Sequence, residues 1–251
     1  MSEAPKLFSV LGLPVHLLDD YPGWLRSRLQ QGLGTHVVTL NAEMTMQAER
    51  HNTLAGVIRQ AELVIPDGAG VVLYLRLQGK PIQRCPGIEL AESLLQSSGH
   101  LEARKSVFFY GGAPGVAEAA AAVWQRQIPS LSVAGTQHGY LSPAEQEKLR
   151  QTLTQLQPQL IFVGLGVPRQ ELWIAQHRSL CPQATWIGVG GSFDIWAGVK
   201  SRAPAWLADN HLEWLYRLYQ EPWRWRRMLA LPKFAGKALV HRLSPRRLMG
   251  Q

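Results

Sequence analysis

The chain has 251 residues, of which 46% are hydrophobic and 18% charged, and its net charge at neutral pH is +8. This composition excludes wholesale disorder and is sufficient for a sizeable core. The chain lacks both a run of about 18 apolar residues and the layout of a signal peptide, which argues against a membrane-spanning or exported protein. We therefore expect Cys85 and Cys181 to be reduced thiols in a cytoplasmic protein.

Positive charge is concentrated at the C-terminal end. Residues 212–251 contain nine Lys or Arg and two Glu, a net charge of +7, whereas the first 211 residues are nearly neutral at +1. This asymmetry predicts a polyanionic partner, for which nucleic acid, anionic lipid and sugar diphosphates all qualify.

Short apolar runs recur along the chain, and most of them end on Gly or a polar residue. We expect strands at 7–12, 36–41, 63–68, 106–112, 131–136, 160–166 and 186–191. The intervening segments are mostly helical in composition, including 114–128 with Pro114 at its start and 142–156 with Ser142 as N-cap. Apolar strands that alternate with helices indicate the α/β class, with a parallel sheet covered by helices on both faces.

The composition changes near Pro204, where Trp, Arg and Leu become frequent. We therefore expect residues 1–203 to form the α/β catalytic domain and residues 204–251 to form a C-terminal helical, basic appendage. Pro222 should break the helix expected before it.

Polar or glycine residues follow several of the expected strands. They are Thr39, Asn41, Asp67, Gly111, Gly112, Gln170 and Asp194. Ligands of open α/β sheets bind in the crevice outside the carboxyl ends of the strands. We therefore expect these residues to converge on one ligand-binding crevice.

Asp67 lies between Pro66 and Gly68, directly after an expected strand. Pro-Asp-Gly is also good turn chemistry, so the pattern alone is equally compatible with a simple turn. In the functional interpretation, the rigid strand end holds a carboxylate that accepts a proton as a general base.

Two glycine-rich loops follow strands, GLGVPRQE at 164–171 and GVGGSFD at 188–194. Glycines let backbone N–H groups approach phosphates, although each loop is also compatible with an ordinary tight turn. Neither loop fits G-x-G-x-x-G, because Arg169 and Phe193 occupy the third glycine position, which disfavours a nicotinamide dehydrogenase. The candidate substrate-binding glycines in these loops are Gly164, Gly166, Gly190 and Gly191.

No P-loop and no D-x-D sequence occur, which disfavours ATP hydrolysis and leaves a diphosphate-holding metal without obvious ligands. We expect neither a metal site nor a bound cofactor. Arginines must then stabilise any diphosphate that leaves during a reaction.

Aromatic and basic residues alternate in LEWLYRLYQEPWRWRRMLALPKF, at 212–234. A core-packing helix with a solvated basic side is the commonest origin of such a pattern. Trp223 and Trp225 stand among three arginines, a density that suits a membrane surface. The interleaving also suits single-stranded nucleic acid, but no nucleic-acid-binding fold signature accompanies it.

Several short motifs, each weak alone, occur in order between about residues 9 and 229. They are Thr39-x-Asn41-Ala42-Glu43, Pro66-Asp67-Gly68, Arg84, Gly87-x-x-Leu90, Gly111-Gly112, Gly139-Tyr140, Gly164-x-Gly166-x-Pro168-x-Gln170-Glu171, Gly188-Val189-Gly190-Gly191-x-Phe193-Asp194, Arg202-Ala203-Pro204 and Leu212-Glu213-Trp214-Leu215-Tyr216-Arg217-Leu218. In this order they resemble the WecG/TagA/CpsF glycosyltransferase family.

The resemblance implies inverting transfer of a sugar from a UDP-sugar donor to a polyprenyl-diphosphate-linked sugar, in the synthesis of cell-surface polysaccharides such as teichoic acid. It implies a Rossmann-like domain at the inner face of the cell membrane, docked on anionic lipid through its C-terminal appendage. By this resemblance Asp67 is the base. The crevice is lined by Thr39, Asn41, Arg84 and Gln170, the nucleotide-sugar is contacted by Asp194, and the diphosphate is faced by Arg217, Arg224 and Arg227.

One departure from the family is Glu89, where Asp is common; Glu keeps the charge but reaches about one methylene further. Two other classes stay open: an α/β nucleotide-binding module with a nucleic-acid-binding basic tail, and a nucleotide-sugar enzyme without lipid, such as an epimerase. For the glycosyltransferase we expect no nucleic-acid partner. The sequence leaves open the transferred sugar, which is N-acetylmannosamine, its uronic acid or glucose in the family, and is compatible with a homo-oligomer.

Overall fold

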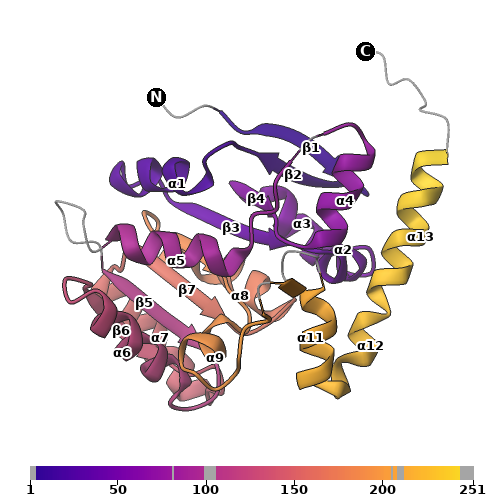
Figure 1. Ribbon diagram of the computed structural model, residues 1–251. Coiled ribbons are helices and arrows are strands. Elements are labelled where there is room, and N and C mark those ends of the chain that lie inside the picture. Colours follow the sequence, from indigo (N-terminus) through magenta and orange to yellow (C-terminus); the bar gives the residue numbers. More distant parts are fainter. Residues whose placement is uncertain (1–3, 81, 99–105, 205, 208–211, 244–251) are drawn as a thin grey trace.

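The computed structural model describes residues 4–80, 82–98, 106–204, 206–207 and 212–243. Its centre is a six-stranded sheet in which every neighbouring pair is parallel (Figure 1). The strand order is β4-β3-β8-β7-β5-β6. The strands are β3 (Thr35–Leu40), β4 (Leu63–Pro66), β5 (Val107–Gly111), β6 (Val133–Gln137), β7 (Leu160–Gly164) and β8 (Thr185–Gly188).

Helices cover both faces of this sheet, and successive strand residues point to opposite faces. Val37 packs in one cluster with α1 (Tyr21–Gln30), α5 (Gly87–Ser98), α6 (Val116–Gln127) and α9 (Ser192–Trp196). Its neighbour Val38 packs on the other face with α2 (Ala42–Ala48), α3 (Asn52–Gln60) and α4 (Ala69–Leu77). On the same face, α7 (Pro143–Leu156) and α8 (Arg169–His177) cover the rest of the sheet. The short helix η1 (Arg178–Leu180) directly follows α8. The predicted α/β, Rossmann-like class is confirmed.

The first apolar run does not join the parallel sheet, contrary to the prediction for 7–12. Instead β1 (Lys6–Val10) pairs antiparallel with β2 (Leu13–Leu17) as a separate two-stranded sheet. Only Leu11 and Gly12 connect these strands, both at positive φ (49° and 83°), and two residues are too few for the crossover that parallel strands need.

Both helices singled out in the sequence form. Ser142 caps α7, as predicted, and does so through a reciprocal capping box with Glu145. The other helix, α6, begins at Val116 after Gly115, so Pro114 precedes the helix and is not its first residue.

The topology places a crevice between β3 and β8. The helix after β3, α2, packs on one face, whereas the helix after β8, α9, packs on the opposite face. The two connections therefore diverge at the carboxyl ends of adjacent strands, a topological switch point at which open α/β sheets bind ligands.

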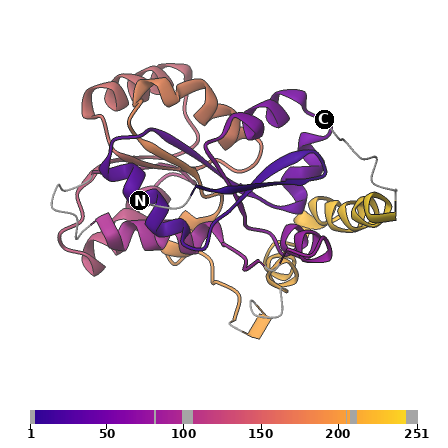
Figure 2. The same cartoon turned by 90° about the horizontal axis from the view of Figure 1, so that it is seen from above.

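The C-terminal region is helical, with α11 (Glu213–Gln220), η2 (Pro222–Arg224), α12 (Trp225–Met228) and α13 (Ala230–Leu243). The α11 helix ends before Pro222, as predicted. Figures 1 and 2 both show α13 along the outside of the α/β body. Its Phe234 is buried against Tyr74 of α4, with ring centroids 6.2 Å apart.

The boundary between 1–203 and 204–251 stays a prediction. The part of the appendage beyond residue 243, with Arg246 and Arg247, lies outside the described residues. Across the described part of the chain, every helix is too short or too polar to cross a bilayer.

Candidate active site

A polar pocket occupies the switch-point crevice and is closed on one side by the C-terminal helices. It is lined from the carboxyl ends of β3, β4, β7 and β8, from the segment 84–88 and from α11, η2 and α12. The structure brings these candidate residues of the sequence together there: Thr39, Asn41, Asp67, Arg84, Gly166, Gln170, Gly190, Gly191, Arg217, Arg224 and Arg227.

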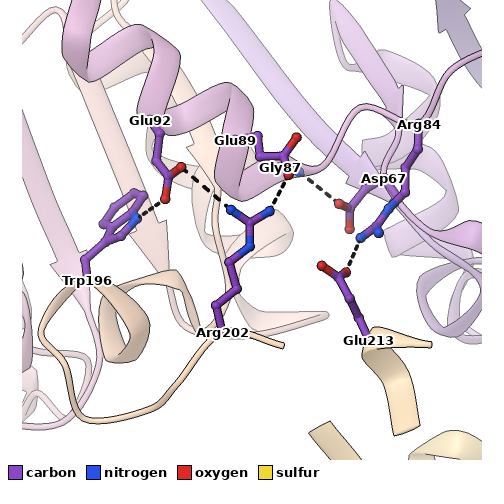
Figure 3. Close-up of polar contacts among 8 residues, drawn as sticks. All are labelled: Asp67, Arg84, Gly87, Glu89, Glu92, Trp196, Arg202 and Glu213. Carbon is purple, nitrogen blue, oxygen red and sulfur yellow. Dashed lines mark hydrogen bonds and ion pairs between the residues drawn. The ribbon is translucent and has the colours of Figure 1, made fainter. Parts of the chain in front are cut away.

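Asp67 follows β4 and holds its carboxylate at the N-terminus of α5. Its Oδ1 accepts a hydrogen bond from the backbone N–H of Gly87 at 2.8 Å (Figure 3). Burial raises the pKa of the Asp67 carboxyl, and this effect outweighs the opposing effects of Arg84, the Gly87 N–H and Arg217. Oδ1 is therefore fixed in place, and a raised pKa makes the group a stronger proton acceptor.

Arg84 connects Asp67 to the appendage. Its Nε donates to the backbone carbonyl of Asp67, and its terminal nitrogen forms an ion pair with Glu213 of α11 at 2.5 Å (Figure 3). Both charged side chains are largely buried, so this pair is stronger than an exposed one. The appendage thus holds a residue that orients the Asp67 turn.

Asn41 and Thr39 have local roles as well as lining the pocket. The Asn41 side chain caps α2 by accepting from the Met44 N–H at 2.9 Å. The Thr39 hydroxyl donates to the Gly188 carbonyl at 3.3 Å and so joins β3 to β8. Asn41 keeps its amide NH₂, and Thr39 its hydroxyl lone pairs, for a ligand.

Gln170 is almost fully buried and ties the two glycine-rich loops together. Its Oε1 accepts from the N–H groups of Gly166 and Gly190, at 3.1 and 3.0 Å. Its Nε2 donates to Glu171 at 2.8 Å. Because those two N–H groups bond to Gln170, they are not the phosphate donors that the loop pattern suggested.

Four candidate residues lie outside the pocket lining: Gly111, Gly112, Gly164 and Asp194. Close packing explains the glycine at 111, where φ is +135° and a Cβ would lie 2.4 Å from the Gly164 carbonyl oxygen. Gly112 donates its N–H to the same carbonyl at 3.0 Å. Asp194 forms an ion pair at 2.7 Å with Lys200, whose side chain does line the pocket.

Most cations of the pocket already have a carboxylate partner. Arg224 pairs with Glu221 at 2.5 Å, and Arg227 with Glu43 at 2.6 Å. Lys200 also pairs with Glu221, at 3.1 Å. The Arg217 guanidinium has no ion pair or hydrogen bond with another described residue, and its charge acts on the Asp67 carboxyl in the same pocket.

Some residues of the pocket had no role predicted from the sequence: the acidic partners Glu43, Glu213 and Glu221, and the cations Lys200 and Arg202. Arg202 lines the pocket and pairs with Glu89, the residue that departs from the common Asp (Figure 3). Glu43, Arg202 and Glu213 stood within the motifs quoted above, which was the available signal. Their contacts are not predictable locally, since Arg227 and Glu43 are 184 positions apart.

The structure also bears on metal ligands and on the two cysteines. Across the described residues, no cluster of three or more His, Cys, Asp or Glu side chains could hold a metal ion. Both cysteines are free thiols, as expected. Burial raises the pKa of Cys85 to about 12 and that of Cys181 to about 11.

Glu171 provides a pH test of this site. Burial raises the pKa of its fully buried carboxyl from 4.5 to about 7, so the folded state holds the proton more tightly than the unfolded state. Wild-type stability should therefore fall as the pH rises through this window, whereas Glu171→Gln lacks that loss. The free energy of unfolding should be measured by urea denaturation for both proteins. Between about pH 4 and pH 8, the difference between Glu171→Gln and wild type should change by up to about 3 kcal/mol in favour of the variant. Glu118→Gln, at an exposed helix position, should show little shift.

Comparison with known proteins places this geometry in a family. Residues 8–248 match the model of the glycosyl transferase WecG/TagA/CpsF family. The chain is 39% identical over 214 residues, covering 85% of this chain and 82% of the relative, to the N-acetylglucosaminyldiphosphoundecaprenol N-acetyl-beta-D-mannosaminyltransferase of Bacillus spizizenii. Proteins of the same name from Bacillus subtilis (34%, covering 82% of this chain and 80% of the relative) and Staphylococcus aureus (36%, covering 80% and 78%) are also similar. The chain therefore belongs to the WecG/TagA/CpsF family and is a glycosyltransferase.

Proposed function

We propose that this enzyme transfers N-acetylmannosamine from a UDP-sugar to an N-acetylglucosamine that is linked through a diphosphate to a polyprenyl lipid. The observation that carries the proposal is the Asp67 carboxylate, held at the N-terminus of α5 in a pocket whose cations come from both the body and the appendage. The names of the relatives supply the two sugars and the lipid. Family membership favours this enzyme over a nucleic-acid-binding module.

Asp67 acts as the base in this scheme. Gly87 holds Oδ1, so the second carboxylate oxygen accepts the proton of the acceptor hydroxyl. The hydroxyl oxygen forms a bond to the anomeric carbon of the donor as the bond from that carbon to the diphosphate oxygen breaks. A single displacement of this kind inverts the anomeric configuration, and UDP leaves with the bonding electron pair.

Side-chain cations neutralise the diphosphates in this scheme. Both substrates carry a diphosphate, and the lining includes Arg84, Lys200, Arg217, Arg224 and Arg227. Arginine forks match phosphate oxygens well and bind them through charge-assisted hydrogen bonds. We infer that transfer needs no metal ion, because these cations stabilise the leaving diphosphate electrostatically.

The donor and the acceptor enter from different sides of Asp67. The loops after β7 and β8, with Gly166, Gly190 and Gly191, face the donor, and the Asp194–Lys200 pair adjoins them. The appendage, with Arg217 and Arg227, faces the lipid-linked acceptor. The acceptor then lies beside the exposed aromatic residues Tyr219, Trp223 and Trp225 of the appendage.

We also propose that the appendage docks the enzyme on the anionic inner face of the cell membrane. Tyr219, Trp223 and Trp225 are 82%, 70% and 54% exposed. Arg226 lies over the Trp225 ring at 5.4 Å, so basic and aromatic groups share one surface. Such a surface combines interfacial tryptophan anchoring with attraction to anionic headgroups.

Asp67→Asn tests the base. The substitution removes the proton acceptor while keeping the size of the side chain, so turnover should fall by about 10²–10⁴-fold. UDP release should be measured with UDP-N-acetylmannosamine and a synthetic N-acetylglucosaminyl diphosphate lipid. Titration should show unchanged binding of the UDP-sugar, because the carboxylate acts on the acceptor.

Asp20→Asn is a matched control, because Asp20 caps α1 at the surface and Asn caps equally well. It should retain wild-type turnover. Near-native turnover of Asp67→Asn would exclude Asp67 as the base.

Excess EDTA tests the stabilisation of the leaving group. Since arginine and lysine side chains neutralise the diphosphate, initial rates should stay within about twofold of those without chelator. Loss of activity that Mg²⁺ or Mn²⁺ restores would contradict metal independence.

UDP-glucose in the same assay tests the choice of sugar. We expect the turnover of UDP-N-acetylmannosamine to exceed the turnover of UDP-glucose.

Removal of two exposed tryptophans tests membrane docking. Trp223→Ser with Trp225→Ser should reduce co-sedimentation with anionic liposomes by about tenfold, because both indoles leave the interface. The matched control is Leu33→Ser with Leu156→Ser, at exposed positions elsewhere on the body (43% and 46% exposed). Equal losses in both double variants would show that the appendage is not the docking surface.

A further inference from the structure

An apolar groove lies between α4 and α13. Figure 1 shows α13 beside α4, along the outside of the α/β body. Its volume is about 690 Å³, larger than that of the polar pocket. Leu73 and Leu77 of α4 and Ala235, Ala238 and Leu239 of α13 line it. Leu73 and Leu239 are both 58% exposed, so the groove presents apolar surface to its surroundings.

This apolar groove begins where the polar pocket ends. At the β3–α2 turn, Asn41 and Glu43 line the pocket while Ala42 lines the groove. After β4, Asp67 lines the pocket while Ala69 lines the groove.

The polar pocket and the apolar groove also meet at α11, where Glu213 lines the pocket and Trp214 lines the groove. The Arg227–Glu43 ion pair also stands at this border, since Glu43 adjoins Ala42. A ligand with a charged head and an apolar chain could therefore occupy both sites without leaving the protein surface.

We propose that the apolar groove binds the first isoprene units of the polyprenyl chain of the acceptor; this inference rests on the proposed function. The diphosphate of that acceptor joins its sugar directly to the chain, so a diphosphate in the polar pocket delivers the chain to the adjoining groove. The continuity of the two sites selects this occupant over an unrelated lipid. α4 leads away from the pocket for nine residues, about 13 Å, which matches the proximal part of a long chain.

The groove chemistry fits a branched hydrocarbon. The lining is apolar except for Tyr74, Arg76 and Gln78, and the Tyr74 hydroxyl is hydrogen-bonded to His241 at 2.9 Å. Gly70 adds no side chain to the lining, and a Cβ there would lie in ordinary van der Waals contact with Ala42 at 3.4 Å and Phe234 at 3.5 Å. Methyl-branched chains gain affinity from such surfaces through burial of apolar area.

Farnesyl diphosphate and inorganic diphosphate test this inference in solution, without a bilayer and without turnover. In calorimetry, wild-type protein should bind farnesyl diphosphate about a hundredfold more tightly than inorganic diphosphate. Each methylene buried in the groove should increase the affinity by about fourfold. Arg217→Ala should weaken binding of both ligands, since it removes an available cation of the pocket. This readout does not depend on sugar transfer, so failure of the proposed activity would be seen separately in the UDP-release assay.

Ala235→Trp fills the groove and should reduce the preference for farnesyl diphosphate to about threefold or less, with inorganic diphosphate binding unchanged. Val240→Trp is its control, on the same helix at an exposed position outside the groove lining. Leu73→Gln, on the opposite wall, should reduce the preference in the same direction, and Leu33→Gln should not. Thermal melts of the variants establish that each one is folded.

Four results would overturn the inference. Wild-type protein could bind farnesyl diphosphate no more tightly than inorganic diphosphate, or Ala235→Trp and Val240→Trp could lose the same affinity. Farnesol could bind as tightly as farnesyl diphosphate, which would show a lipid site uncoupled from the pocket. Light scattering that shows a wild-type dimer dispersed by Ala235→Trp would assign the groove to a second copy of the chain.

Discussion

Arg84 joins the strand that carries Asp67 to the helix that closes the pocket. One nitrogen donates to the Asp67 carbonyl, and another forms an ion pair with Glu213 of α11. The carboxylate of Asp67 is held separately by Gly87, three residues after Arg84. The position of Asp67, the proposed base, and the contact of the appendage with the body therefore share one guanidinium, and loss of either contact would disturb the other.

Further ion pairs join the body and the appendage around the pocket. Several cations converge there, and their mutual repulsion in a half-buried site would be costly without compensation. Glu43, Glu213 and Glu221 supply that compensation from both sides of the boundary between body and appendage. In the proposed reaction a diphosphate competes with these carboxylates for the same donors, so the carboxylates would set how strongly the pocket retains an anionic ligand.

Much of the fold was readable from the sequence. Six of the expected strands enter the parallel sheet, because continuous apolar runs between helices have few other places in a folded domain. The exception is the run at 7–12. An apolar run predicts a strand but does not predict which strand it pairs with. The positive φ of Leu11 and Gly12 decided the pairing, and no periodicity reveals it.

The candidate site was predictable to the extent that it depends on topology. Residues at the carboxyl ends of parallel strands must meet, which is why Thr39, Asn41 and Asp67 line one pocket. The bonds of Gln170 to two separate loops, and the partner of Arg227, depend on tertiary geometry that local spacing does not encode. Gly111 was expected in the crevice because it ends an expected strand, but its backbone instead packs closely against the Gly164 carbonyl of another strand end.

The two cysteines have a practical consequence for studying the appendage. With pKa values of about 12 and 11, fewer than about one in ten thousand of these thiols is ionised at neutral pH, and the thiolate is the reactive form. Cys181 is also buried away from reagents. A new cysteine at an exposed position of α11 or α12 would react far faster than either. Such a variant can therefore carry a single fluorescent or spin label on the appendage without prior removal of Cys85 and Cys181, and the mobility of that label would report when these helices move.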